Sequence, residues 1–152
     1  MNEADGESSS AFGHKNNANK VFSVAVGSQN ISDAENSSAI GFLNKTTGKN
    51  SVAFGAGYLD ENQEIHYNEA KEEKSLAVGI GNTSSKIGSI TFGSQNTSDA
   101  ENSSAIGFLN KTDGEKSSAF GVENNATKDY SSAIGYKNTA SGKNSSSVGY
   151  NN

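Results

Sequence analysis

The sequence predicts an all-β solenoid built from coils of 14 residues that stack on one another. Three observations favour this fold class. A phrase that ends in glycine recurs ten times, the residues within it alternate between small and large, and an asparagine follows nearly every glycine at a fixed distance. Internal repetition of this kind is typical of solenoids, in which each repeat contacts its neighbours and no thick central core is needed.

The recurring phrase is Ser-x-Ala-(apolar)-Gly, and its glycines define the period. Successive glycines are 14 residues apart, except for one spacing of 24 between Gly55 and Gly79, which adds ten residues. We therefore expect about ten coils over residues 1–152, interrupted by an insertion within residues 56–74. The glycines are Gly13, Gly27, Gly41, Gly55, Gly79, Gly93, Gly107, Gly121, Gly135 and Gly149.

The alternation within the phrase predicts a strand. The residue before each glycine is large and apolar, and the residue before that is Ala in eight copies, with Thr91 and Ser147 as the exceptions. A period of two places the apolar column on one face of the strand and the small column on the other. We expect the apolar column to form a thin core and the small columns to form flat surfaces where chains meet. One large apolar residue per coil offsets little of the backbone entropy, about 1–2 kcal/mol per residue, so composition favours an oligomer.

An asparagine column predicts turns. Asparagine lies three residues after every glycine but one, and Tyr58 stands in that place in the coil with the insertion. Because asparagine and glycine tolerate positive φ, two columns of these residues indicate two sharp turns per coil. Coils with two short strands would stack about 4.8 Å apart, which gives a rod of roughly 45 Å for ten coils.

Composition and charge argue against several classes of protein. The chain is only 32% hydrophobic, contains no Cys, and carries a net charge of −5 with scattered lysines. Nucleic acid and anionic membrane are therefore unexpected partners, and no thiolate metal site is possible. No apolar stretch reaches the roughly 20 residues of a membrane-spanning helix. His14 and His66 lie far apart, and no catalytic or metal-ligand pattern is visible, so we expect no enzyme activity and no cofactor.

Several motifs resemble a known family. Asn36-Ser-Ser-Ala-Ile-Gly41, Asn50-Ser-Val-Ala-Phe-Gly55 and Asn138-Thr-Ala-Ser-Gly142 look like the head repeats of YadA-like trimeric autotransporter adhesins. The resemblance implies a left-handed parallel β-roll and a homotrimer, displayed on the outer membrane of a Gram-negative bacterium as a virulence factor. It also implies binding to a host receptor, such as a carcinoembryonic-antigen-related adhesion molecule, or to a matrix protein such as collagen. The signal peptide, neck, stalk and membrane anchor of such proteins are not expected within these residues.

The insertion is the first candidate binding site, because the repeat rule fails there. It carries six acidic residues and two lysines, a net charge of −4 against −1 for the rest of the chain. Its segment 58–67 has two strand-like ends around a polar turn, which predicts a hairpin. Loops on rigid scaffolds often carry recognition, although the segment could equally be a solvated protrusion or pack on a neighbouring subunit. The candidate ligand-binding residues are Tyr58, Leu59, Asp60, Glu61, Ile65, His66 and Tyr67.

A secondary candidate is the pair Leu43 and Leu109. They occupy equivalent places in a duplication in which residues 28–55 match residues 94–121 at 23 of 28 positions. Their column is mostly polar, so we expect both leucines to be exposed, as isolated surface leucines often are. Two functions remain open at this stage. The chain is an adhesin head that binds a host protein, or it is a rigid spacer or autoagglutination module without its own ligand.

Overall fold

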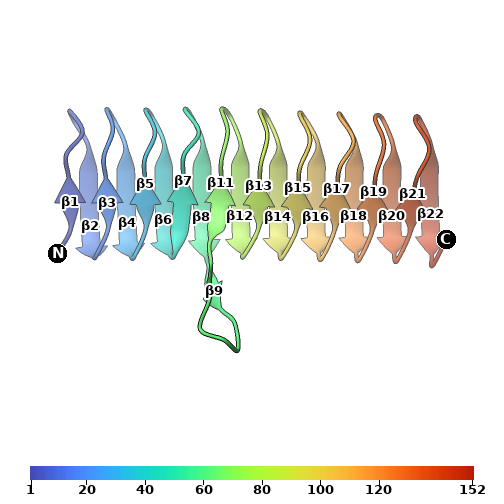
Figure 1. Cartoon of the computed structure of the whole chain (residues 1–152), viewed down its shortest axis with the longest axis horizontal. Coiled ribbons are helices and arrows are strands. Elements are labelled where there is room, and N and C mark those ends of the chain that lie inside the picture. Colours follow the sequence, from blue (N-terminus) through green and yellow to red (C-terminus); the bar gives the residue numbers. More distant parts are fainter.

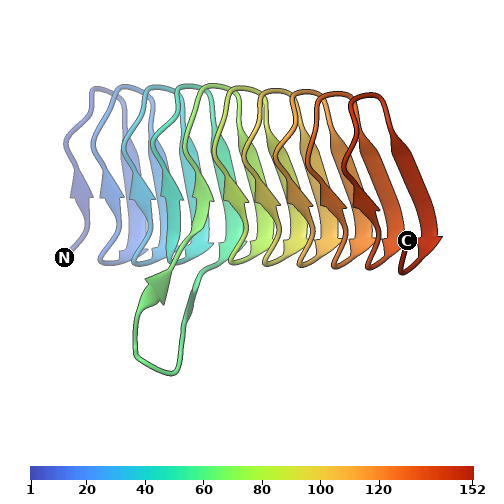
Figure 2. The ribbon, with the colours of Figure 1, turned by 45° about the vertical axis from the view of Figure 1, so that its right-hand side comes forward.

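The computed structural model describes all residues 1–152 and shows two parallel ten-stranded sheets joined by turns at both edges (Figure 1, Figure 2). One sheet, the short-strand sheet, has strands of two or three residues, and the other, the long-strand sheet, has strands of five. Each coil contributes one strand to each sheet, which confirms the predicted parallel β-solenoid. No helix in the structure is long and apolar enough to cross a membrane.

The strands alternate between the two sheets along the chain. The short-strand sheet contains, in spatial order, β1 (Glu3–Ala4), β3 (Asn17–Ala18), β5 (Ile31–Ser32), β7 (Asn44–Thr46), β11 (Asn68–Ala70), β13 (Thr83–Ser84), β15 (Thr97–Ser98), β17 (Lys111–Thr112), β19 (Asn125–Ala126) and β21 (Thr139–Ala140). The long-strand sheet contains β2 (Ser10–His14), β4 (Val24–Ser28), β6 (Ser38–Phe42), β8 (Val52–Ala56), β12 (Leu76–Ile80), β14 (Ile90–Ser94), β16 (Ser104–Phe108), β18 (Ser118–Val122), β20 (Ser132–Tyr136) and β22 (Ser146–Tyr150).

Equivalent residues of successive coils pair directly. Gly27 lies opposite Gly41, and the register continues across the insertion, where Gly55 lies opposite Gly79. The repeated glycine is required by this stacking. At Gly107, φ is +125°, and an added Cβ would lie 1.9 Å from the carbonyl oxygen of Gly121. Only a residue without a side chain allows such close approach of two strands.

The interior of the coil is filled by small and polar residues. The long strands therefore turn the opposite face inward from the one that we predicted. Ala is the only apolar residue type in the buried set apart from Leu43. Large residues of the apolar column point outward instead, and Phe54 and Phe92 are 52% and 54% exposed. The expectation that this column fills the core is therefore wrong. The two sheets lie too close for side chains larger than Ala, Ser, Thr or Asn, so the large members of each alternation face away.

The asparagine column lies at the links between long and short strands, as predicted, and its side chains turn inward to form a buried ladder. Asn96 is fully buried, and its Nδ2 donates to Oδ1 of Asn82 at 3.0 Å and to the carbonyl oxygen of Gly107 at 2.8 Å. Its own Oδ1 accepts from the backbone nitrogen and Nδ2 of Asn110, at 3.0 and 3.1 Å. The same contacts recur along the rod. Buried amides stay in the core because both their donors and their acceptors are paired.

Positive φ occurs beside the asparagine ladder. At one edge it falls on the residue before each ladder asparagine from Asn16 to Asn152 except Asn68, and at the other edge on a second column of mostly exposed residues. Gln29, Leu43 and Gln95 belong to the first column, and Asn36 and Asn102 to the second. Two turns per coil are thus confirmed, but the repeated glycine lies inside the long strands instead of at a turn, and residues of several types adopt the left-handed backbone in the turns.

Candidate functional site

The insertion folds into a β-hairpin that projects beyond one edge of the rod (green in Figures 1 and 2). Its strands are β9 (Tyr58–Leu59) and β10 (Ile65–His66), which pair antiparallel with Ile65 opposite Leu59 and His66 opposite Tyr58. The predicted hairpin is confirmed. It leaves the coil after β8 and returns at β11, so it interrupts only the turn between them.

At the root of the hairpin, the chain returns to the spacing of the repeat. Asn68, and not Tyr58, takes the ladder position of this coil, because its Nδ2 donates to Oδ1 of Asn44 at 2.9 Å. Gly57 is buried against Leu43, and the backbone nitrogen of Asn68 donates to the carbonyl oxygen of Leu43 at 3.2 Å. Removing residues 58–67 would leave Gly55-Ala56-Gly57-Asn68, which has the spacing of every other coil. The inserted unit is therefore these ten residues.

One side of the hairpin is fixed to the rod through aromatic packing. The rings of Tyr58 and His66 are stacked, with centroids 4.8 Å apart and planes 12° from parallel. The Tyr58 ring also lies over Gly81 of the following coil, where an added Cβ would be 2.4 Å from the ring. Gly57 and Gly81 stand two residues after Gly55 and Gly79, in a column where the other coils carry larger residues. Sequence reasoning missed these two glycines, although their column distinguishes them.

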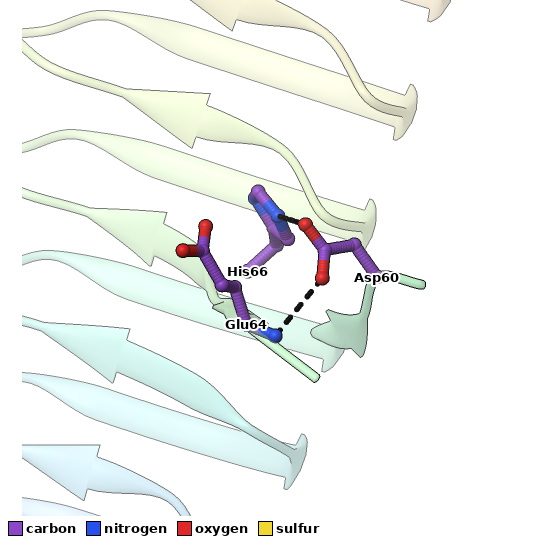
Figure 3. Close-up of side chains that lie close together, drawn as sticks. All are labelled: Asp60, Glu64 and His66. Atoms are coloured by element: carbon purple, nitrogen blue, oxygen red, sulfur yellow. Dashed lines mark hydrogen bonds and ion pairs between the residues drawn. The ribbon is translucent and has the colours of Figure 1, made fainter. Parts of the chain in front are cut away.

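Asp60 holds the turn of the hairpin in place (Figure 3). Its Oδ1 accepts hydrogen bonds from the backbone nitrogens of Asn62 and Glu64, both at 2.9 Å, and its Oδ2 accepts one from Nε2 of His66 at 3.3 Å. The backbone nitrogen of Gln63 donates to the carbonyl oxygen of Asp60, and Gln63 has a φ of +64°. This is the three-residue hairpin loop in which a left-handed residue follows a type I turn. The hydrogen bond from Glu64, then those from His66 and Asn62, lower the pKa of Asp60.

The turn gathers three potential metal ligands that sequence spacing did not group. One ligand atom each from Asp60, Glu64 and His66 lies within 4.8 Å of the others. Both oxygens of Asp60 are already engaged in the hydrogen bonds that shape the hairpin. The hydrogen bonds of Asp60 therefore connect the turn to His66 and, through the ring stack, to Tyr58.

The other side of the hairpin is exposed. Leu59 and Ile65 form a cross-strand pair and are 46% and 48% exposed. Glu61 and Glu64 are also exposed, on the loop beside this pair. Tyr67 is half-buried, with Nζ of Lys45 5.7 Å from its ring centroid. The seven candidate residues thus lie together, but they divide between an anchored side and an open side.

The secondary candidates behave differently from each other. Leu109 is 43% exposed, as expected, whereas Leu43 is only 2% exposed. The expected exposure of Leu43 is wrong because the hairpin root covers it through Gly57. Two nearly identical segments therefore present different surfaces, and the insertion is the cause.

Comparison with protein families decides what kind of repeat this is. A family model described as the YadA head domain repeat (2 copies) matches residues 4–30, 32–57, 84–110, 98–124, 112–138 and 126–152. The chain belongs to the YadA head family. This is an adhesin family, so the YadA-like resemblance of the motifs is confirmed. No curated protein is similar enough to the chain to count as a relative.

The YadA head matches leave out the hairpin. Residues 58–83 lie outside all six matched segments, and they contain the whole of β9 and β10. The unmatched stretch also contains the coil strands β11 and β12, which keep the register of the other coils, so the ten-residue hairpin is what departs from the repeat.

Proposed function

We propose that the chain is the head of a trimeric autotransporter adhesin, displayed on the outer membrane of a Gram-negative bacterium and binding a host receptor or matrix protein. Membership of the YadA head family is the observation that carries this proposal. The candidate ligand-binding residues are the seven predicted in the hairpin, and Leu109 is a secondary candidate. The seven are Tyr58, Leu59, Asp60, Glu61, Ile65, His66 and Tyr67.

The exposed apolar column supports a homotrimer. Phe54, Phe92 and Ile134 lie on the outer face of the long-strand sheet and are 52%, 54% and 39% exposed. Such a row of large apolar groups is costly in water and marks a contact surface. Three copies arranged about an axis parallel to the rod would bury these faces together, with equivalent coils at the same level.

A binding screen and a mass measurement test this proposal. Light scattering should give about 47 kDa, three times the 15.7 kDa of one chain. The trimer should bind at least one of immobilised collagen, fibronectin or the amino-terminal domain of a carcinoembryonic-antigen-related adhesion molecule. A particle of 15.7 kDa would contradict the trimer.

The alternative function is a rigid spacer or autoagglutination module. The uninterrupted stacking of ten strands in each sheet favours a stiff rod whatever its ligand. This function predicts a trimer that binds none of the host proteins yet makes bacteria that display it agglutinate.

A further inference from the structure

The open side of the hairpin has the make-up of a protein contact. Leu59 and Ile65 lie opposite each other on neighbouring strands and are each nearly half exposed. Side chains alternate along a strand, so this pair lies on the opposite side of the hairpin from Tyr58, which contacts Gly81 of the rod, and from His66, which stacks on Tyr58. An apolar pair at the centre of a projecting element, surrounded by polar groups, is the usual composition of a contact hot spot.

The charge around the pair is of one sign. Asp60, Glu61 and Glu64 are acidic, and segment 58–67 contains no lysine or arginine. Because Asp60 is engaged with His66 and the turn, Glu61 and Glu64 are the carboxylates free to meet a partner. Surfaces of one sign attract partners of the opposite sign and repel nucleic acids and anionic lipids.

The hairpin is also ordered before any partner arrives. The Tyr58–His66 stack, the contact of Tyr58 with Gly81 and the hydrogen bonds of Asp60 fix it from the rod to the tip. An element that is already ordered loses little conformational entropy on binding. This rigidity distinguishes the hairpin from a loose solvated loop.

We propose that the Leu59–Ile65 side of the hairpin docks onto a positively charged protein surface with an apolar centre, while Tyr58 holds the hairpin to the rod and Asp60 and His66 keep the hairpin itself in shape. The inference rests on the proposed adhesin function and specifies the chemistry of its partner. Another copy of this chain fits poorly, because its net charge is −5 and the coils without the insertion still sum to −1. The partner is therefore a different, basic protein.

Binding of hairpin variants to the three host proteins named above tests the proposal. Leu59→Ser/Ile65→Ser should weaken binding at least about tenfold, chiefly through faster dissociation. Glu61→Gln/Glu64→Gln should slow association at low salt by about threefold or more and flatten its salt dependence. Deletion of residues 58–67, which closes the coil in register, should abolish binding.

A matched variant controls for general loss of negative charge. Glu7→Gln/Glu101→Gln removes two exposed carboxylates from turns that lead from short to long strands, the edge opposite the hairpin. It should bind as the wild type does, and all variants should keep the circular dichroism spectrum of the rod.

The outcomes separate the two proposals. If the wild type binds a host protein and the hairpin variants bind it equally well, the docking inference is wrong and the adhesin function stands. If binding is lost with Leu59 and Ile65 but does not respond to salt or to the glutamate variant, the basic partner is wrong. If the wild-type trimer binds none of the three proteins, the adhesin function fails and the docking inference fails with it.

Discussion

In the asparagine ladder, one buried side chain per coil makes most of the side-chain hydrogen bonds between neighbouring coils. Asn96 donates through Nδ2 to Asn82, Phe92 and Gly107 and accepts twice from Asn110. Asparagine suits this position because its amide has two donors and an acceptor on a side chain short enough for the narrow interior. The ladder thus links each coil to both of its neighbours through buried hydrogen bonds.

Asn96→Ala should therefore destabilise the rod strongly. The substitution leaves the buried backbone N–H of Asn110 without its acceptor and removes the hydrogen bonds to Asn82, Phe92 and Gly107, at a cost of about 3–5 kcal/mol. Asn102→Ala is the control, since Asn102 is exposed with a φ of +53° and its replacement should cost about 1 kcal/mol for the left-handed backbone. Chemical unfolding of both variants checks this, and equal costs would show that the ladder is not a main source of stability.

Substitution of Gly81 is predicted to change the packing of the hairpin without changing the stability of the rod. Gln29 and Gln95 occupy the same column with φ of +56° and +53°, so Gly81→Gln is compatible with the backbone. Its Cβ would collide with the Tyr58 ring, so the Tyr58–His66 stack should break while the unfolding midpoint changes little. Ring chemical shifts measured by NMR report the stack. Leu109→Gln, in the same column with no ring above it, should leave those shifts unchanged.

At the scale of the element, the sequence located the hairpin but not its attachment. The spacing of 24 between Gly55 and Gly79 revealed ten additional residues, and the strand-like ends predicted their pairing. The spacing rule placed Tyr58 in the asparagine column because Tyr58 is three residues after Gly55. The chain leaves the coil at that point and returns to it only after the hairpin. Asn68 takes that position because its buried amide completes the ladder with Asn44, a contact that only the stacked coils reveal.

The hairpin should loosen in acid. The pKa of Asp60 is lowered below its ordinary value of 3.8, so its carboxylate stabilises the folded hairpin well above that pH. This contribution should be lost as the pH falls below 3.8 through the folded pKa. NMR shifts of the Leu59 and Ile65 methyl groups should move toward random-coil values over that range. Asp60→Ala should give such shifts already at neutral pH, and Leu109 should serve as an unaffected reference.

For the whole molecule, the sequence predicted the period, the parallel strands and the poor core, but it reversed which face lies inside. An alternation of large and small residues fixes a period of two without showing which set is buried. The usual rule that large apolar residues are internal fails here, because paired sheets this close hold only Ala, Ser, Thr and Asn. The need for a second buried surface still follows, and the exposed large residues are the surface that the proposed trimer would bury.

The outward apolar column should therefore hold the trimer together. Phe54→Asp/Phe92→Asp places charges on the face where three copies would meet, and burial of an unpaired charge is strongly unfavourable. Light scattering over a range of concentrations should show dissociation of this variant or loss of its folded signal, whereas Phe54→Leu/Phe92→Leu should remain trimeric. Thr97→Asp changes the outer face of the short-strand sheet and should also leave the trimer intact. If Thr97→Asp dissociates the particle and Phe54→Asp/Phe92→Asp does not, the copies meet through the short-strand sheet.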